Sequence, residues 1–397
     1  MSGDFIYLDY ASTAPVRLEV KSATAKFFDR SFGNPSSLHR LGQEALAALD
    51  QARVKIQTVV EARSLNEIIF VSSATEANNL IIKGLAFDYL SRFKKIPHLI
   101  SSEIDHPSVV ETMKELERLG QVHLSLIKPD RSGLISWSGI ERAIRPNTIL
   151  ISIHLVNSET GVIQEIKKIA EGIETINQNS EVKIIFHSDA SQAATTERIS
   201  IGALGLDGLT LSGHKIGGLK GAGALVLNQK IKLVRLLSGS DQEFGRRAGT
   251  ENVAAVVGLA TALELSQNEL DQTRPELERI RNYLIERLNS TKIDFELNHR
   301  LVDSSAKILN IYLPGAEARD LMIFLDQNNV FVSAGMACKA RAPIPSPTVY
   351  SQFSSSERAR RSLRFSFGRS TTKKEIDRTV GLIETFLNRT ANFNKRR

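Results

Sequence analysis

Short apolar runs alternate with longer helical patterns through the first 255 residues. A run at residues 66–73 precedes a helical pattern over 74–93, and a run at 97–106 precedes another helical pattern over 107–119. Strands that alternate with helices are joined by right-handed crossovers, which place the strands side by side with helices on both faces. The alternation therefore predicts an α/β fold built on a mostly parallel sheet.

The pattern changes after residue 255, and at 397 residues the chain is too long for a single small core. A long helical pattern covers residues 253–288, and we expect a break or bend near Pro275. Short strands and an amphipathic helix follow. We predict a large domain over 15–255 and a smaller α/β domain over 256–397 that also takes in residues 1–14.

Polar side chains stand at the C-terminal ends of five expected strands. They are Ser73-Ala74-Thr75, His106, Asn157, Asp189 with Gln192, and Ser212-Gly213-His214-Lys215. In open α/β sheets, ligands bind in the crevice outside these ends. The five groups therefore predict one shared ligand site.

Three kinds of group in this set suit a phosphorylated, cationic ligand. Ser73 and Glu76 have the spacing of a capping box, so free N–H groups at a helix start would bind phosphate. Ser212 and His214 can add donors. A buried Asp189 carboxylate would need a cationic partner, such as a pyridinium nitrogen.

Two further side chains extend this chemistry. His106 offers a flat ring for stacking. Lys215 offers an amine at the end of an apolar run, where desolvation would lower its pKa from about 10.4 towards neutrality. A phosphate site, a partner for a ring nitrogen and an amine that reacts with aldehydes together describe pyridoxal 5′-phosphate.

Other interpretations of the same residues remain open at this point. A lysine at a strand end is usually solvated. The glycine-rich residues 218–223 could form a dinucleotide loop, although they do not directly follow a strand. His187, Asp189 and His214 could ligate a metal, but this spacing is common by chance and we expect no metal site.

Composition narrows the class of protein. The net charge is +7, with basic clusters that are not interleaved with aromatics. We interpret them as solvated charge, with a docking surface for an acidic partner as the alternative and no direct nucleic-acid binding. There is one cysteine, no signal-peptide pattern and no apolar run of the roughly 18 residues that a membrane span needs. We expect a cytoplasmic enzyme.

Nine stretches occur in an order that is similar to one enzyme family. They are YLDYASTAP, FGNPSSLHRLG, SSATEANNL, VNSETGVIQEI, HSDASQ, SGHKIGGLKGAGAL, RRAGTEN, VSAGMAC and LRFSFGRSTT. From about residue 5 to 385 the chain resembles the NifS/IscS-type cysteine desulfurases, which are class V aminotransferase-like enzymes of fold-type I. The resemblance implies a seven-stranded-type sheet, pyridoxal phosphate, a homodimer, and conversion of L-cysteine to L-alanine.

The resemblance also implies roles around the ring of the cofactor. Lys215 would form the Schiff base, and Asp189 would bind the pyridine nitrogen. Gln192 would hydrogen-bond the ring hydroxyl. His106 would stack on the ring and relay protons, and Asn157 would face the cofactor or the substrate.

Further roles concern the phosphate and the substrate. The phosphate cradle would consist of Ala74, Thr75, Ser212 and His214. Thr250 would reach the phosphate of the neighbouring subunit. Arg364 would clamp the substrate carboxylate, which suits a bidentate guanidinium.

Cys338 would accept the sulfur as a persulfide and pass it to a protein scaffold or sulfur carrier. Only the thiolate is nucleophilic, and Lys339 and Arg341 would lower a thiol pKa that is ordinarily about 8.5. Taken alone, a lone cysteine is commonly a small buried apolar residue. The neighbouring glycine, alanines and prolines instead indicate an exposed loop.

Two rival functions use the same residues differently. In the first, the chain is another class V lyase or aminotransferase, such as a selenocysteine lyase, and Cys338 is not catalytic. In the second, it is a cofactor-binding scaffold that has lost turnover. Iron–sulfur cluster assembly is one destination for the sulfur, with tRNA thiolation and DNA modification as others.

Overall fold

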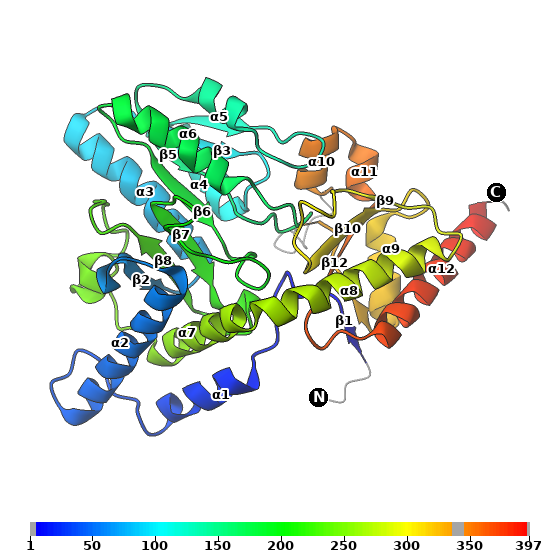
Figure 1. Cartoon of the computed structure of the whole chain (residues 1–397), viewed down its shortest axis with the longest axis horizontal. Helices are drawn as coiled ribbons and strands as arrows, with labels where there is room; N and C mark the ends of the chain where they lie inside the picture. Colours follow the sequence, from blue (N-terminus) through cyan, green and yellow to red (C-terminus); the bar gives the residue numbers. More distant parts are fainter. Residues whose placement is uncertain (1–4, 336–344, 395–397) are drawn as a thin grey trace.

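The computed structural model describes residues 5–335 and 345–394 (Figure 1). Its largest sheet has seven strands in the order β2-β8-β7-β6-β5-β3-β4. These are β2 (Ile68–Val71), β3 (His98–Ser102), β4 (His123–Ile127), β5 (Thr148–Ser152), β6 (Ile185–Asp189), β7 (Gly208–Ser212) and β8 (Gly223–Leu227). Strand β8 runs antiparallel to both its neighbours and the other pairs are parallel. The predicted mostly parallel α/β sheet is confirmed.

Helices cover both faces of this sheet, so its central strands are buried throughout. One face packs against α1 (Leu18–Ala25), α2 (Arg40–Val60), α5 (Trp137–Ala143), α6 (Ile166–Asn179) and α7 (Val253–Asn268). The other face packs against α3 (Ala74–Phe93) and α4 (Pro107–Arg118). Burial on both faces explains why the strands appear in the sequence as continuous apolar runs.

A second core is built by the C-terminal third of the chain together with its N-terminal segment. Its sheets are β9 (Glu296–Leu297), β10 (Ile308–Tyr312) and β12 (Ser362–Ser366), which are antiparallel, and β1 (Ile6–Tyr7) parallel to β11 (Val330–Phe331). Its helices are α8 (Leu270–Asn289), α9 (Ala318–Gln327), α10 (Pro347–Phe353), α11 (Ser356–Arg360) and α12 (Lys373–Asn394). Ile6 and Leu8 lie in this second core beside Phe365.

Four short 3₁₀ turns complete the described elements. They are η1 (Lys26–Phe28), η2 (Leu65–Glu67), η3 (Gly213–Lys215) and η4 (Gln242–Gly245). Among the described residues, no helix has the length and apolar character needed to cross a bilayer.

The long helical pattern breaks at Glu269, ahead of Pro275. Helix α7 ends at Asn268 and α8 begins at Leu270, so the break is at Glu269 and Pro275 lies inside α8. The Glu269 carboxylate accepts two 2.8 Å hydrogen bonds from Arg17, which fixes the junction. Pro275 is the sixth residue of α8, so its missing N–H removes one hydrogen bond of that helix.

The chain passes from the core of the large sheet to the second core at this break. Leu259 and Leu263 of α7 pack in the core of the large sheet, whereas Leu277 of α8 packs in the second core. The expected division between residues 255 and 256 stays a prediction, and α7 packs on the side of the large sheet.

Candidate functional site

A cavity of about 280 Å³ lies at the carboxyl ends of the parallel strands. Nine of the predicted site residues line it together: Ala74, Thr75, His106, Asp189, Gln192, Ser212, His214, Lys215 and Arg364. Arg364 comes from β12, and Ala11 and Ser12 come from the N-terminal segment. The cavity therefore lies where the two cores meet.

The start of α3 forms one end of the cavity. Ser73 caps the helix, because its Oγ accepts from the Glu76 backbone N–H at 3.2 Å. The Glu76 carboxylate accepts from the backbone N–H of Ser72 at 2.7 Å, one residue before the cap. A Cβ at Gly223 would lie 2.6 Å from the carbonyl carbon of Ser73, so only glycine lets β8 approach this helix start. The arrangement presents backbone N–H groups to an anion.

Asp189 ends β6 and is 7% exposed. Its Oδ2 accepts from Asn78 Nδ2 at 2.7 Å and its Oδ1 accepts from the Ser191 backbone N–H at 2.9 Å. Nearby, Gln192 Nε2 donates to the Ala11 carbonyl at 2.8 Å. Gln192 Oε1 is buried without a partner among the described residues, so it is available to a donor on a ligand.

A short hydrogen-bonded chain orients His106, the residue that caps α4. Its Nδ1 accepts from the Ser108 backbone N–H at 3.1 Å and lies 2.7 Å from Ser108 Oγ. Asn78 Nδ2 donates to Ser108 Oγ at 2.8 Å, so this hydroxyl can donate onward to His106. Nδ1 is therefore an acceptor, and in the neutral ring the proton is on Nε2.

Lys215 lies in η3, directly after β7, and its Nζ donates to the carbonyls of Ala11 at 2.6 Å and Ser12 at 2.9 Å. Its own carbonyl accepts from Lys307 Nζ at 2.9 Å. Burial, and then the charges of Lys215 and Arg364, lower the pKa of Lys307 to about 7. The lowered pKa expected for Lys215 itself stays a prediction.

His214 is half-buried beside this lysine. Its Nδ1 lies 3.2 Å from Thr13 Oγ1. Burial, followed by the charges of Lys215, Lys220 and Lys307, lowers the pKa of His214 to about 4. The ring is therefore neutral at neutral pH, and its nitrogens serve as hydrogen-bonding groups.

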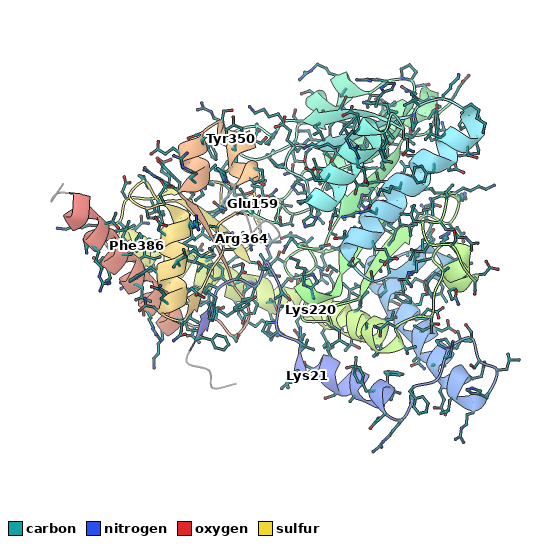
Figure 2. All side chains as sticks on the ribbon, turned by 180° about the vertical axis from the view of Figure 1, so that it is seen from behind. Lys21, Glu159, Lys220, Tyr350, Arg364 and Phe386 are labelled. Atoms are coloured by element: carbon teal, nitrogen blue, oxygen red, sulfur yellow. The ribbon has the colours of Figure 1, made fainter. Side chains whose placement is uncertain are left out.

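Arg364 is 2% exposed and lies in the middle of the molecule near Glu159 (Figure 2). It holds the N-terminal segment against the turn after β5. Its Nη1 donates to the Ser158 carbonyl at 2.7 Å. Its Nη2 donates to Asp9 Oδ1 at 2.7 Å and to Ser12 Oγ at 2.8 Å. Its Nε is buried and has no partner within the described ranges. These contacts use three of the five guanidinium N–H groups, so Nε–H and the second Nη1–H remain for a ligand carboxylate.

Three predicted residues are not placed at the cavity. Asn157 is buried, with its amide oxygen accepting from the backbone of Glu159 and Thr160 at 2.9 Å each, so it braces a turn. Thr250 is exposed. Cys338 lies outside the described residues, as do Lys339 and Arg341. The roles assigned to these residues stay predictions.

Sequence reasoning missed a buried pair, Asp105 and His154. Asp105 Oδ1 accepts from the backbone N–H of His154 at 2.7 Å and contacts its Nδ1 at 3.0 Å. Burial alone would raise the pKa of Asp105, but His154 and Ser102 outweigh it and hold that pKa low. His154 also lines the cavity. The available signal was a histidine inside an otherwise apolar run.

The structure does not match the two alternative interpretations, a metal site that includes His187 and a dinucleotide loop at residues 218–223. Both ring nitrogens of His187 lie against hydroxyls, Nδ1 2.8 Å from Ser152 Oγ and Nε2 3.0 Å from Thr210 Oγ1. No group of three or more metal-ligating side chains occurs in the described part of the chain. Residues 218–223 lead from η3 into β8 and open no helix, so they lack the context of a dinucleotide loop.

Comparisons with known proteins agree with this geometry. Residues 6–379 match the family described as aminotransferase class-V. The chain is 37% identical over 385 residues to cysteine desulfurase IscS of Dictyoglomus turgidum, covering 96% of this chain and 94% of that protein. It is 36% identical over 392 residues to cysteine desulfurase IscS of Methanosarcina thermophila, covering 98% and 93%.

Solved structures give the same result. A NifS-like protein superposes with a TM-score of 0.89 at 28% identity, covering 97% of this chain and 99% of that one. SspA in complex with cysteine superposes with a TM-score of 0.79 at 34% identity, covering 91% and 98%.

Proposed function

This chain belongs to the class V aminotransferase family, and we propose that it is a cysteine desulfurase that uses pyridoxal 5′-phosphate. In this proposal it converts L-cysteine to L-alanine and leaves the sulfur as a persulfide on Cys338. The observation that carries the proposal is the convergence of Lys215, Asp189 and Arg364 on one cavity.

The residues present fit the cofactor. The N–H groups at the start of α3, with Ser212 and His214, would hold its phosphate. The buried Asp189 carboxylate would hold the pyridinium nitrogen, and Gln192 Oε1, which no described residue contacts by a hydrogen bond, would accept from the ring hydroxyl. When bound, pyridoxal phosphate acts as an electron sink for the substrate.

The protein's own groups would then perform four tasks. Arg364 binds the substrate carboxylate through the two N–H groups that Asp9, Ser12 and the Ser158 carbonyl leave unused. Lys215 Nζ, which donates to the carbonyls of Ala11 and Ser12, takes the proton from the α-carbon. His106, oriented by Ser108, stacks on the ring and passes protons through Nε2.

The fourth task belongs to Cys338. Its thiolate attacks the substrate sulfur, so that a sulfur–sulfur bond forms and the carbon–sulfur bond breaks. The electron pair stays with the carbon, which takes up a proton to give alanine. The persulfide then passes to an acceptor protein, either a scaffold or a sulfur carrier.

The proposal includes a homodimer and a cytoplasmic location. Thr250 is exposed, as a residue that reaches a neighbouring subunit must be before assembly. A reducing compartment keeps a lone catalytic thiol free. Fractionation of cells that express the tagged chain tests the location.

The decisive experiment measures alanine and sulfide from L-cysteine in the presence of a thiol reductant. We expect wild-type protein to show a visible absorbance band that borohydride abolishes, and to produce both products. Lys215→Ala should lose the borohydride-fixed cofactor, whereas the control Lys220→Ala, at an exposed position in the following loop, should keep it.

Cys338→Ser separates the proposed function from its rivals. We expect it to keep the visible band and release no sulfide. Full-rate turnover of cysteine or selenocysteine by this variant would make the chain a lyase in which the thiol is a bystander. A coloured wild-type protein that is inactive on all amino acids would make it a cofactor-binding scaffold.

A further inference from the structure

We propose that His154, held in place by Asp105, is an additional binding residue of the cavity and hydrogen-bonds the ring edge of the bound cofactor beside Asp189. The inference rests on the proposed function, because it concerns a ligand of the same cavity. It adds a residue pair that contributes to cofactor binding through one ring nitrogen of His154.

Asp105 fixes which nitrogen of His154 is available. Asp105 is fully enclosed, and five hydrogen bonds reach its carboxylate, from Ser101, from the backbone and hydroxyl of Ser102, and from the backbone and Nδ1 of His154. An ionised carboxylate can only accept hydrogen bonds, so His154 Nδ1 carries a proton and donates a hydrogen bond to Asp105. Nε2 is the nitrogen that remains for a ligand.

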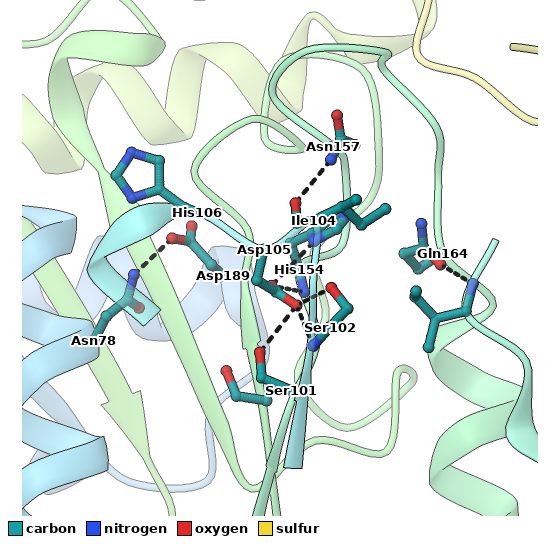
Figure 3. Close-up of polar contacts among 12 residues, drawn as sticks. Asn78, Ser101, Ser102, Ile104, Asp105, His106, His154, Asn157, Gln164 and Asp189 are labelled. Atoms are coloured by element: carbon teal, nitrogen blue, oxygen red, sulfur yellow. Dashed lines mark hydrogen bonds and ion pairs between the residues drawn. The ribbon is translucent and has the colours of Figure 1, made fainter. Parts of the chain in front are cut away.

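The register of the sheet places His154 on the face of Asp189. Ser152 pairs with His187 in the β5–β6 register, and their side chains hydrogen-bond at 2.8 Å on the same face. The ladder continues beyond β5, since the backbone N–H of Leu155 donates to the Asp189 carbonyl at 3.0 Å. Side chains two residues apart share a face. His154 and Asp189 therefore project from neighbouring strand ends on one side of the sheet (Figure 3).

His154 Nε2 is a buried atom to which no described residue hydrogen-bonds. The residue is 4% exposed and lines the cavity. Nε2 has no hydrogen-bond partner among the residues of 5–335 and 345–394. A buried polar atom without a hydrogen bond costs free energy, so such atoms are usually hydrogen-bonded to a ligand or a water. The same condition holds for Gln192 Oε1 on the cavity wall.

A purely structural pair makes a different prediction from a ligand-binding pair. If His154 serves only to satisfy Asp105, Nδ1 is the atom that matters. If His154 serves the ligand, Nε2 matters. The side-chain amide of asparagine occupies the position of Nδ1, and that of glutamine occupies the position of Nε2.

The variants His154→Asn and His154→Gln form the matched pair for the test. The full-length protein is stripped of cofactor and titrated with pyridoxal 5′-phosphate, and binding is followed by absorbance. Loss of one hydrogen bond predicts that His154→Asn binds about tenfold more weakly than wild type. His154→Gln should bind within about threefold of wild type, because it restores a polar group at Nε2.

A second readout is the pH titration of the visible band in resting protein without substrate. We expect its midpoint to change in His154→Asn and to return towards the wild-type value in His154→Gln. Cofactor affinity in His154→Asn equal to wild type, or weaker binding by His154→Gln than by His154→Asn, would overturn the inference.

Folding and the proposed function are controlled separately. Thermal unfolding of the stripped proteins shows whether each variant folds, and His154→Gln alone tests the inference if His154→Asn does not. A wild-type protein that takes up no pyridoxal phosphate contradicts the proposed function itself. A wild-type protein that binds it, with variants in the wrong order, contradicts only the role of His154.

Discussion

Lys307 shows how burial changes the chemistry of one residue beside the site. Its side chain is 2% exposed and its Nζ donates to the backbone carbonyl of Lys215. Burial is the largest cause of its lowered pKa, which falls to about 7. Lys307 thus stabilises the segment that carries Lys215, whereas burial of its own positive charge costs free energy.

This lowered pKa predicts a pH-dependent stability. The folded-state pKa is about 7, and the unfolded-state pKa of lysine is about 10.4. The unfolded state therefore binds more protons between these values, so the free energy of unfolding rises as pH rises from 7 to 10. The penalty is fully present below pH 7.

Lys307→Met removes this titration. We expect its free energy of unfolding to rise less than that of wild type between pH 7 and 10, by up to about 1.4 kcal/mol per pH unit. Urea unfolding at several pH values measures the difference. Lys220→Met, at an exposed position, should keep the wild-type slope. Equal slopes in Lys307→Met and wild type would contradict the assignment.

At the scale of elements, the start of α3 links helix capping to ligand binding. Ser73 Oγ caps this helix, and the same residue lines the cavity. Ser136 caps α5 in the same way, with its Oγ 3.2 Å from the Gly139 backbone N–H, and does not line the cavity. The two helices therefore offer a matched comparison.

Ser73→Ala and Ser136→Ala should each lower the free energy of unfolding by about 1 kcal/mol. Only Ser73→Ala should also weaken binding of pyridoxal phosphate, because the frayed helix start presents its N–H groups poorly. Denaturant unfolding and absorbance titration measure the two effects. Unchanged cofactor affinity in Ser73→Ala would show that the cap does not support the phosphate site.

Element junctions also hold the two cores together. Glu159, in the turn after β5, accepts from Ser346 Oγ at 2.5 Å and from Thr348 Oγ1 at 2.7 Å. Ser346 is the cap of α10, so a carboxylate from the large-sheet side anchors a helix of the second core. Arg364 of β12 makes a further contact of this kind, because its Nη1 donates to the Ser158 carbonyl in the same turn after β5.

At the scale of the whole molecule, large apolar side chains are exposed near the N-terminal helices. The exposed fractions are 71% for Phe28, 67% for Phe32 and 93% for Leu38. Exposed apolar groups of this size, gathered in one stretch of chain, are typical of interaction surfaces. They support the homodimer in the proposed function.

The double variant Phe32→Asp with Leu38→Asp should weaken self-association, because it places charges on this surface. Sedimentation velocity across a range of protein concentrations measures the change. Val302→Asp is the control, since Val302 is 75% exposed but lies on the side of the second core. A wild-type monomer, or a double variant that remains fully dimeric, would contradict this prediction.

The sequence by itself determined the alternating elements, and with them the position of the ligand site. Apolar runs such as residues 66–73 end in polar groups. Because the crossover pattern aligns the ends of the strands, Asp189 and Lys215 could be placed together in advance. The capping spacing of Ser73 and Glu76 is likewise local.

The tertiary structure alone decided which side chains meet across strands. The Asp105–His154 pair depends on residues 49 positions apart, and the contact of Arg364 with Asp9 on residues 355 positions apart. Strand order and register determine such contacts, and the local periodicity of the sequence specifies neither of them. The burial of Asn157 and the break at Glu269 follow the same rule, because the Ile104 carbonyl and the Arg17 side chain, both distant in the sequence, hydrogen-bond to them.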